Sequence, residues 1–142
     1  MDRIEIKKVT KDKKTLEDYF RLYSILKTVL PEYSRRIEKL EYLNSRNLSS
    51  HVLSLNGHVV GGYILHDEGD IAYLEFIALI ESSQSKGLGK LLINNLMEEV
   101  SKLGFSEVRA ETKSENLPIF KKLNFKEYFP GDEGFVSIYL NV

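Results

Sequence analysis

The stretch that decides the fold is IAYLEFIALIESSQSKGLGK, residues 71–90. Its first ten residues are almost entirely apolar, as expected for a strand at the centre of a sheet. A polar segment containing Gly87 and Gly89 follows, and leucines then recur with helical spacing. A strand, a glycine-containing connector and a helix in this order predict a binding site for a phosphate group, because unpaired N–H groups at a helix start attract anions.

The residues before this stretch predict a strand, two helices and a β-hairpin. Apolar and charged residues alternate over 3–9, as in a first strand. After Thr15, the expected N-cap, apolar residues recur with helical spacing, and a second helix is expected over 32–45. The dipeptide Asn56–Gly57 separates two strand-like runs, which is typical of a β-hairpin.

The residues after the connector complete a mixed fold. They predict a helix that ends at Gly104, a strand over 105–112, a short helix over 114–125 and a hairpin over 126–142. The resulting order is β-α-α-β-β-β-α-β-α-β-β. It fits one mixed α/β (α+β) domain over residues 1–142, in which helices flank a largely antiparallel sheet.

Composition excludes several classes of protein. The chain has 142 residues and a formal net charge of −1, so it lacks the basic excess expected of a nucleic-acid-binding protein. It has no cysteine, which excludes disulfides, thiolate zinc sites and a cysteine nucleophile. Its start is charged, and no apolar run approaches the roughly 18 residues of a membrane helix. We therefore expect a cytoplasmic protein that contacts neither a membrane nor nucleic acid.

The three histidines lie in or beside the predicted hairpin, at His51, His58 and His66. Their spacing is not that of a helical metal-binding motif such as HExxH. We therefore predict scattered surface histidines and no metal site.

Three motifs compete for the connector. A P-loop requires GxxxxGK[ST], but Gln84 replaces its first glycine and Leu91 its hydroxyl residue. The dinucleotide-binding fingerprint GxGxxG finds partial support in Glu111, which lies where a ribose-binding acid is expected. However, Leu92 replaces the third glycine of that fingerprint, and six residues separate Gly87 from the strand.

The third motif, Q-x-x-G-x-G, is matched by Gln84, Gly87 and Gly89. At this point the chain resembles the GNAT superfamily, the acetyl-CoA-dependent N-acetyltransferases, whose signature places this motif between an apolar strand and a helix. The segment ENLPIFKKLNF, residues 115–125, is similar to the family segment N-x-x-A-x-x-x-Y-x-K-x-G-F. The order of elements fits over nearly the whole chain, and the matching motifs span residues 71–125. The resemblance therefore implies a single GNAT-type domain.

The resemblance also implies that acetyl-CoA is the acetyl donor. In the family, the CoA pyrophosphate lies on the connector and the pantetheine pairs with the strand before it. Asn116 matches the family asparagine that meets the cofactor from the other side. The residues implied to bind the cofactor are Ile77, Ala78, Leu79, Gln84, Ser85, Lys86, Gly87, Leu88, Gly89, Lys90, Asn116 and Phe120.

Two catalytic roles follow from the resemblance and the residues. A main-chain N–H near Leu79 is implied to polarise the thioester carbonyl. Glu75 is the candidate base, because it interrupts an apolar strand, shares the face of Ile77 and Leu79 by period-two alternation, and would have its pKa raised by desolvation. The alternatives are a buried structural glutamate paired with a neighbouring tyrosine or lysine, and a glutamate near a sheet edge. In the related histone acetyltransferases the base lies two residues earlier, where this chain has Tyr73.

Phe120 stands where many members of the family have a tyrosine that protonates the departing thiolate, and phenylalanine cannot donate a proton. Either the thiol, whose ordinary pKa is about 8.5, leaves without a dedicated acid, or the protein binds acyl-CoA without turnover. The histone acetyltransferase branch also carries phenylalanine there, which favours turnover. Asn124 replaces the glycine of the family's final motif, and asparagine also tolerates left-handed turns.

The predicted function is acetyl transfer from acetyl-CoA to a primary amine by direct attack in a ternary complex, because the chain has no cysteine to carry the acetyl group. The alternative is a non-catalytic acyl-CoA-binding module. The acceptor stays open between a protein lysine, a protein N-terminus and a small amine. The resemblance implies an acceptor groove around residues 30–43 and the hairpin around 128–139. An exposed late strand could pair with a second copy in a homodimer.

Overall fold

Among the described residues, seven strands form one sheet in the order β1-β2-β3-β4-β5-β7-β6. The computed structural model of the chain describes residues 2–10, 13–29, 47–84, 87–130 and 134–142. Neighbouring strands are antiparallel except β4 and β5, which run parallel, so the predicted mixed, largely antiparallel sheet is confirmed. The strands are β1 Ile4–Lys8, β2 Asn47–Leu55, β3 His58–Asp67, β4 Ala72–Leu79, β5 Glu107–Lys113, β6 Lys126–Pro130 and β7 Phe135–Asn141.

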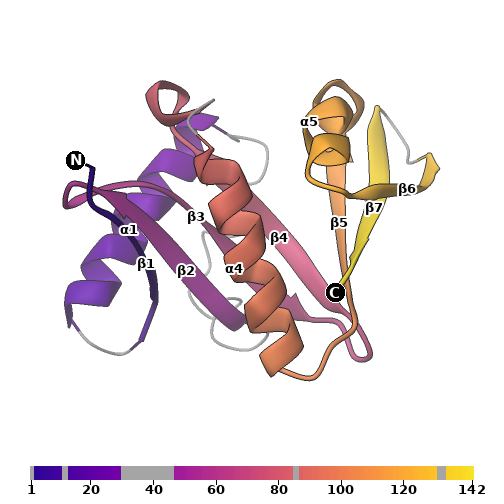
Figure 1. Ribbon diagram of the computed structural model, residues 1–142, viewed down its shortest axis with the longest axis horizontal. Coiled ribbons are helices and arrows are strands. Elements are labelled where there is room, and N and C mark those ends of the chain that lie inside the picture. The colour runs from indigo at the N-terminus through magenta and orange to yellow at the C-terminus, as the bar shows by residue number, and fades with distance from the viewer. Residues whose placement is uncertain (1, 11–12, 30–46, 85–86, 131–133) are drawn as a thin grey trace.

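Helices lie on both faces of this sheet (Figure 1). Along β3, the Tyr63 hydroxyl donates a hydrogen bond to Asn95 on one face, while Gly62 lies against Leu22 on the other. These partners belong to α4 and α1, so the two long helices cover opposite faces. The helices are α1 Lys13–Val29, α4 Leu88–Lys102 and α5 Leu117–Lys122, with short 3₁₀ turns η1 Glu81–Ser83 and η2 Ser114–Asn116.

The N-terminal elements differ in part from the prediction. The first strand is shorter than predicted, and α1 begins at Lys13, so the predicted cap Thr15 lies inside the helix. Lysine is a good helix former, and the two lysines before Thr15 therefore extend the first turn. The second helix predicted over 32–45 lies outside the described residues. Within the described ranges, no helix is both long and apolar enough to cross a membrane.

The predicted hairpin turn is confirmed at Asn56 and Gly57. Both residues have positive φ angles, 53° and 84°, as a two-residue hairpin turn requires. The turn is also joined to the N-terminal strand, because the Arg3 N–H donates to the Asn56 Oδ1 at 2.8 Å. This contact places β1 beside β2 at the edge of the sheet.

The helix after the connector packs its apolar side on the sheet. Leu92, Leu96 and Val100 recur at four-residue spacing and are fully buried. The helix ends as predicted at Gly104, which has a φ of 88°. The Gly104 N–H donates to the Ser101 carbonyl and the Phe105 N–H to the Val100 carbonyl, a common helix-ending pattern.

Two of the three histidines are buried, so the prediction of surface histidines is wrong for them. His66 is fully buried and His51 is 5% exposed, whereas His58 is exposed. His51 lies in β2 with its ring centroid 4.8 Å from that of Tyr63, and its Nε2 is 3.8 Å from the Glu99 carboxylate of α4. Burial lowers the pKa of His51 to about 4, although Glu99 opposes the shift. The imidazole is therefore neutral at neutral pH.

Candidate functional site

β4 and β5 separate from one another after a short contact. Their pairing register covers Ala72 with Val108 and Tyr73 with Arg109, close to where both strands start. Figure 1 shows the two ribbons diverging from there towards their ends. β4 pairs with β3 along its whole length, as far as Leu79. Over residues 74–79 the described residues show no pairing of β4 with β5, and we call the region between the two diverging strands the β4–β5 opening.

The main chain of Leu79 points into this opening. The Ile80 N–H donates to the Val60 carbonyl on the β3 side at 2.8 Å. Because successive N–H groups alternate in direction along a strand, the Leu79 N–H points away from β3, and the Ile77 N–H does the same. The family resemblance implies that an N–H near Leu79 polarises the thioester carbonyl and that the pantetheine pairs with the strand end from Ile77 to Leu79.

The connector begins with η1 and is fastened to the end of β4. The Ser83 N–H donates to the Ile80 carbonyl at 3.0 Å, and the Gln84 Nε2 donates to the Leu79 carbonyl at 2.9 Å. Gln84, which the sequence assigned to cofactor binding, thus ties the connector to the strand. Ser85 and Lys86, assigned to the same role, lie outside the described residues.

The start of α4 leaves room for a ligand at its main chain. Gly87 precedes the helix with a φ of 77°, a conformation that favours glycine. A Cβ added at Gly87 would have no atom within 4 Å, and one added at Gly89 would lie 3.9 Å from the Leu79 side chain. The first N–H groups of the helix, from Leu88 to Lys90, have no partners within the helix. Open glycines and unpaired N–H groups together fit an anionic group such as a pyrophosphate.

Glu75 occupies a β-bulge. The register between β3 and β4 shifts at this point, since Leu65 pairs with Leu74 and Ile64 pairs with Phe76, which leaves Glu75 as the extra residue. Leu74 and Ile77 both pack with the core beneath α4. Glu75 instead contacts His66, which lies on the α1 face.

The predicted common face of Glu75, Ile77 and Leu79 is therefore wrong. The bulge adds one residue between Leu74 and Ile77, so the period-two alternation does not continue through Glu75. The change of face leaves the glutamate nearly inaccessible, at 4% exposure. Its Oε2 lies 3.3 Å from the Nδ1 of His66, whose side chain is also completely buried.

The short helix α5 lies beyond the end of β5, on the far side of the β4–β5 opening from α4 (Figure 1). Asn116 is half-buried at its N-cap. The Phe120 ring is half-buried and meets the Phe125 ring edge to face, with centroids 5.4 Å apart. Asn124 has a φ of 71°, which confirms the left-handed turn predicted at this position. The aromatic pair fastens α5 to the core, and a cofactor contact of Asn116 or Phe120 stays a prediction.

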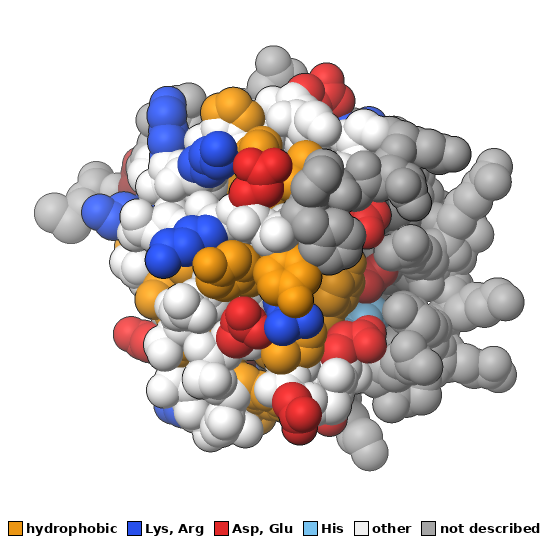
Figure 2. All heavy atoms as spheres, turned by 90° about the vertical axis from the view of Figure 1, so that its right-hand side faces the viewer, with side chains coloured by type: hydrophobic (Ala, Val, Ile, Leu, Met, Phe, Trp, Pro, Cys, Tyr) orange, Lys and Arg blue, Asp and Glu red, His pale blue; other side chains and the backbone are white. Residues whose placement is uncertain are grey.

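The outer face of β5, β7 and β6 is the described part of the predicted acceptor region. Figure 2 shows hydrophobic side chains gathered on this side of the molecule with charged side chains around them. Tyr128 is 51% exposed, the Arg109 guanidinium lies 4.8 Å from its ring centroid, and the Tyr139 ring lies 6.0 Å away. The other predicted wall, residues 30–43, lies outside the described residues.

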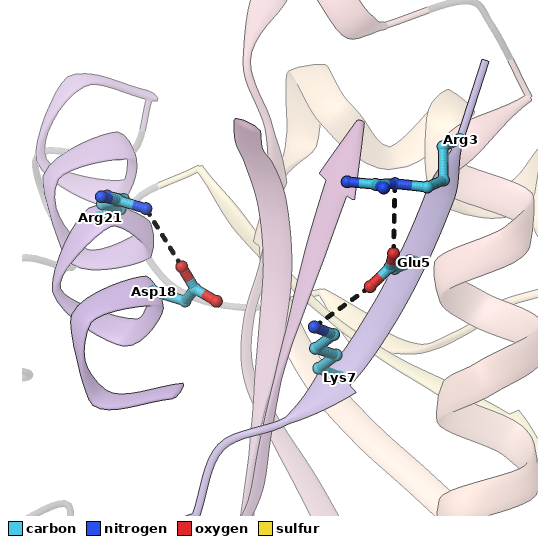
Figure 3. Close-up of polar contacts among 5 residues, drawn as sticks. All are labelled: Arg3, Glu5, Lys7, Asp18 and Arg21. Atoms are coloured by element: carbon cyan, nitrogen blue, oxygen red, sulfur yellow. Dashed lines mark hydrogen bonds and ion pairs between the residues drawn. The ribbon is translucent and has the colours of Figure 1, made fainter. Parts of the chain in front are cut away.

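A charged hollow of about 230 Å³ lies elsewhere, between β1 and α1. In Figure 3, Glu5 lies between Arg3 and Lys7 on β1, at 3.3 and 3.1 Å, and Asp18 pairs with Arg21 on α1. Hydrogen bonding and attraction from Lys7 lower the pKa of Glu5. This hollow is on the edge strand, three strands from the β4–β5 opening, and the drawn cations already have acidic partners. It is therefore not part of the candidate site.

Known proteins share this fold. Residues 15–125 match the model of the acetyltransferase (GNAT) family. An acetyltransferase from Bacillus subtilis in complex with CoA is 22% identical, with a TM-score of 0.73 and 99% of each chain covered. Tetrahymena GCN5 is 20% identical, with a TM-score of 0.81 over 97% of this chain and 96% of that one. The ribosomal-protein-S18-alanine N-acetyltransferase of Escherichia coli is 21% identical, with a TM-score of 0.68 over 100% and 94%.

These structural likenesses show the fold, and the family match covers more than half of the chain and includes the connector. The sequence resemblance is thereby confirmed, and the P-loop and dinucleotide-binding alternatives are excluded. The chain belongs to the GNAT family of acetyltransferases.

Proposed function

We propose that the protein transfers the acetyl group of acetyl-CoA to the nitrogen of a primary amine, by direct attack while both substrates are bound. The observation that carries the proposal is the β4–β5 opening, where an unpaired strand edge leads directly into an open helix start. An extended pantetheine arm is able to pair with such an edge as a strand would, and the pyrophosphate suits the helix start.

The donor side of the proposed site consists mainly of main-chain groups. The N–H groups at the start of α4, beside Gly87 and Gly89, would hold the pyrophosphate, and the edge of β4 at Ile77 would hold the pantetheine. When bound, acetyl-CoA supplies an acetyl group that is activated towards amines. The Leu79 N–H, which points into the opening, would donate a hydrogen bond to the carbonyl oxygen as negative charge develops there.

The acceptor side requires a base. A primary amine has a pKa of about 10, so it is mostly protonated at neutral pH and must lose a proton before it attacks. We assign this proton to Glu75, whose carboxylate is 4% exposed on the α1 face of the β4 bulge and would therefore take the proton through one bridging water. The chain has no cysteine, so an acetyl-cysteine intermediate is excluded and direct attack is favoured. Phe120 cannot protonate the thiolate, but a CoA-type thiol, with an ordinary pKa of about 8.5, can take its proton from water.

The acceptor is proposed as a primary amine of a protein or of a small molecule. Among the proteins with similar structures, one is a histone acetyltransferase from Tetrahymena and one is named for an alanine of ribosomal protein S18. Both names favour a lysine side chain or a protein N-terminus. Tyr128 and Tyr139 on the outer face of β5–β7–β6 have apolar rings and polar hydroxyls, so they would suit contact with a lysine side chain or with a protein N-terminus.

Thiol release from acetyl-CoA with a panel of amines tests the function. The panel contains lysine-bearing peptides, peptides with free N-termini and polyamines. We expect turnover with at least one amine, and Glu75→Gln should lower kcat by a factor on the order of 100 or more without changing CoA affinity. An unaltered pH profile in Glu75→Gln would remove Glu75 as the base.

The second candidate function, a non-catalytic acyl-CoA-binding module, is favoured by one observation, the absence of a proton donor at Phe120. Calorimetric CoA binding separates the two candidates. Tight binding of CoA with no thiol release from any amine would support the module and contradict the transferase.

A further inference from the structure

We propose that His66 is the positioning residue of the base, and that its imidazole donates a hydrogen bond from Nδ1 to Glu75 and keeps this carboxylate ionised and oriented. The inference rests on the proposed function, because it assigns a partner to the base of that reaction. It is carried by the 3.3 Å contact between the His66 Nδ1 and the Glu75 Oε2 and by the burial of both side chains.

The burial of this pair is costly for stability alone. Moving a carboxylate and an imidazole out of water is unfavourable, and apolar residues of similar volume often replace such pairs without loss of stability. Ile64, two residues before His66 and on the same face of β3, is 1% exposed, so apolar packing already contributes to this region. A polar pair in such a place requires an explanation other than packing.

The bulge explains why Glu75 needs a partner. A residue in regular pairing has the direction of its side chain set by the ladder, whereas Glu75 is the extra residue of the bulge. His66, by contrast, lies in regular register opposite Tyr73 and is fully enclosed. The fixed imidazole can therefore set the direction of the less constrained carboxylate.

The pair also decides the charge of the base. A buried carboxylate without a hydrogen-bond donor favours its protonated form, which cannot accept a proton from an amine. An N–H donated by His66 stabilises the ionised form. In the reaction, the amine proton passes to Glu75, and His66 keeps its own proton, so no further reactant is needed.

Tyr73 lies opposite His66 on β4. The helix α1 covers this face of the sheet, and its buried titratable residues are Asp18, which pairs with Arg21 and lines the hollow beside β1, and Tyr19. His51 and Glu99 lie on the opposite face of the sheet, beneath α4. His51 is therefore a matched control, since it is also a buried histidine near a glutamate.

The pH dependence of kcat/KM for the amine is the decisive measurement. His66→Leu removes the donor at similar volume, and the acid limb of the profile should move up by about one pH unit or more, with activity partly recovered at high pH and CoA affinity unchanged. His66→Asn keeps an N–H donor near the position of Nδ1 and should restore a profile close to that of the wild type. His51→Leu should lower stability without moving the limb.

The outcomes separate this inference from the function on which it rests. A uniform loss of activity at every pH in His66→Leu would mean a purely structural histidine and would overturn the inference, while turnover by the wild type would leave the function standing. No turnover with any amine would overturn both.

A measurement on the wild type covers the case in which His66→Leu does not fold. Nitrogen-15 spectra of histidine-labelled protein at neutral pH should show His66 with its proton on Nδ1, and Glu75→Gln should change that signal. A proton on Nε2 alone would contradict the proposed hydrogen bond.

Discussion

The two edges of β4 differ sharply. Towards β3 the strand pairs over its whole length, from Ala72 to Leu79, whereas towards β5 the register covers only Ala72 and Tyr73 among the described residues. The same strand is thus fully paired on one side, whereas on the other side the N–H groups of Ile77 and Leu79 point away from β3 into the β4–β5 opening. Under the proposed function, the difference teaches that a strand edge can become a binding site when the neighbouring strand separates from it.

The edge of β4 that pairs with β3, which we call the closed edge, depends on two adjacent glycines of β3. A Cβ on Gly61 would lie 2.2 Å from the Ala78 carbonyl oxygen, and a Cβ on Gly62 would lie 2.2 Å from the His51 carbonyl oxygen. No L side chain fits at such distances. The dipeptide therefore lets β3 approach both of its neighbours closely, and it fixes the part of β4 whose opposite edge faces the opening.

The largest expected effect comes from blocking the proposed pyrophosphate position at the start of α4. Gly89→Glu places a carboxylate at the start of α4, where it fills and repels the position of the pyrophosphate, and CoA binding should be abolished in calorimetry. A negative charge at a helix start does not destabilise the helix, so the fold should be kept. Gly89→Ala, whose methyl group would make only an ordinary contact with Leu79, is the control and should still bind. Unchanged CoA affinity in Gly89→Glu would contradict the connector assignment.

The next effect comes from forcing the closed edge apart. Gly61→Ala should lower the free energy of unfolding in urea by about 1–3 kcal/mol, because its methyl group overlaps the β4 backbone. The same measurement on Gly89→Ala should give a value close to that of the wild type. If Gly61→Ala were as stable as the wild type, the close contact between β3 and β4 would not be required.

A smaller effect, on the pH dependence of the free energy of unfolding, is expected from His51, the histidine buried in β2. The pKa of His51 is lowered to about 4 in the folded protein, so the unfolded chain binds a proton more readily below pH 6.5. Its contribution to stability is therefore complete above pH 6.5 and is lost as the pH falls towards about 4, with a slope of at most about 1.4 kcal/mol per pH unit. Urea unfolding of the wild type and of His51→Leu should show a steeper acid loss in the wild type. Parallel curves would refute the assignment.

The smallest effect, on kcat, is expected at Phe120 in α5, on the far side of the β4–β5 opening from α4. Phe120→Tyr adds a hydroxyl at the position where many family members have their acid, and kcat should stay within a few-fold of the wild type if water already supplies the proton. Circular dichroism melting checks that the contact with Phe125 is kept. A rise of more than about tenfold would show that protonation of the thiolate limits the wild-type rate.

Local sequence signals predicted much of the fold. The Asn56–Gly57 turn, the end of α4 at Gly104 and the left-handed Asn124 each depend on the conformational preferences of one or two residues, and each is confirmed. The order of the elements along the chain followed from periodicity, and the connector followed from the family motif. These features are encoded within short segments, so the sequence alone carries them.

Features that depend on pairing between strands were not predictable in the same way. The bulge at Glu75 arises from a register shift between β3 and β4, and period-two alternation along one strand cannot detect it. The burial of His51 and His66 depends on the helices that cover the two faces of the sheet. The separation of β4 from β5 likewise leaves no local signal. The partner of the proposed base was missed for this reason, although His66 and Glu75 are only nine positions apart.

The hydrogen bond from Gln84 to the Leu79 carbonyl has a consequence for the choice of donor. It fixes the distance between the strand end, where the thioester would lie, and the helix start, where the pyrophosphate would lie. Under the proposed function, the protein then selects a donor whose length matches the distance between these two binding points. A full-length CoA thioester reaches both ends at once, whereas acetyl-pantetheine ends before the helix and forgoes the contacts at that end.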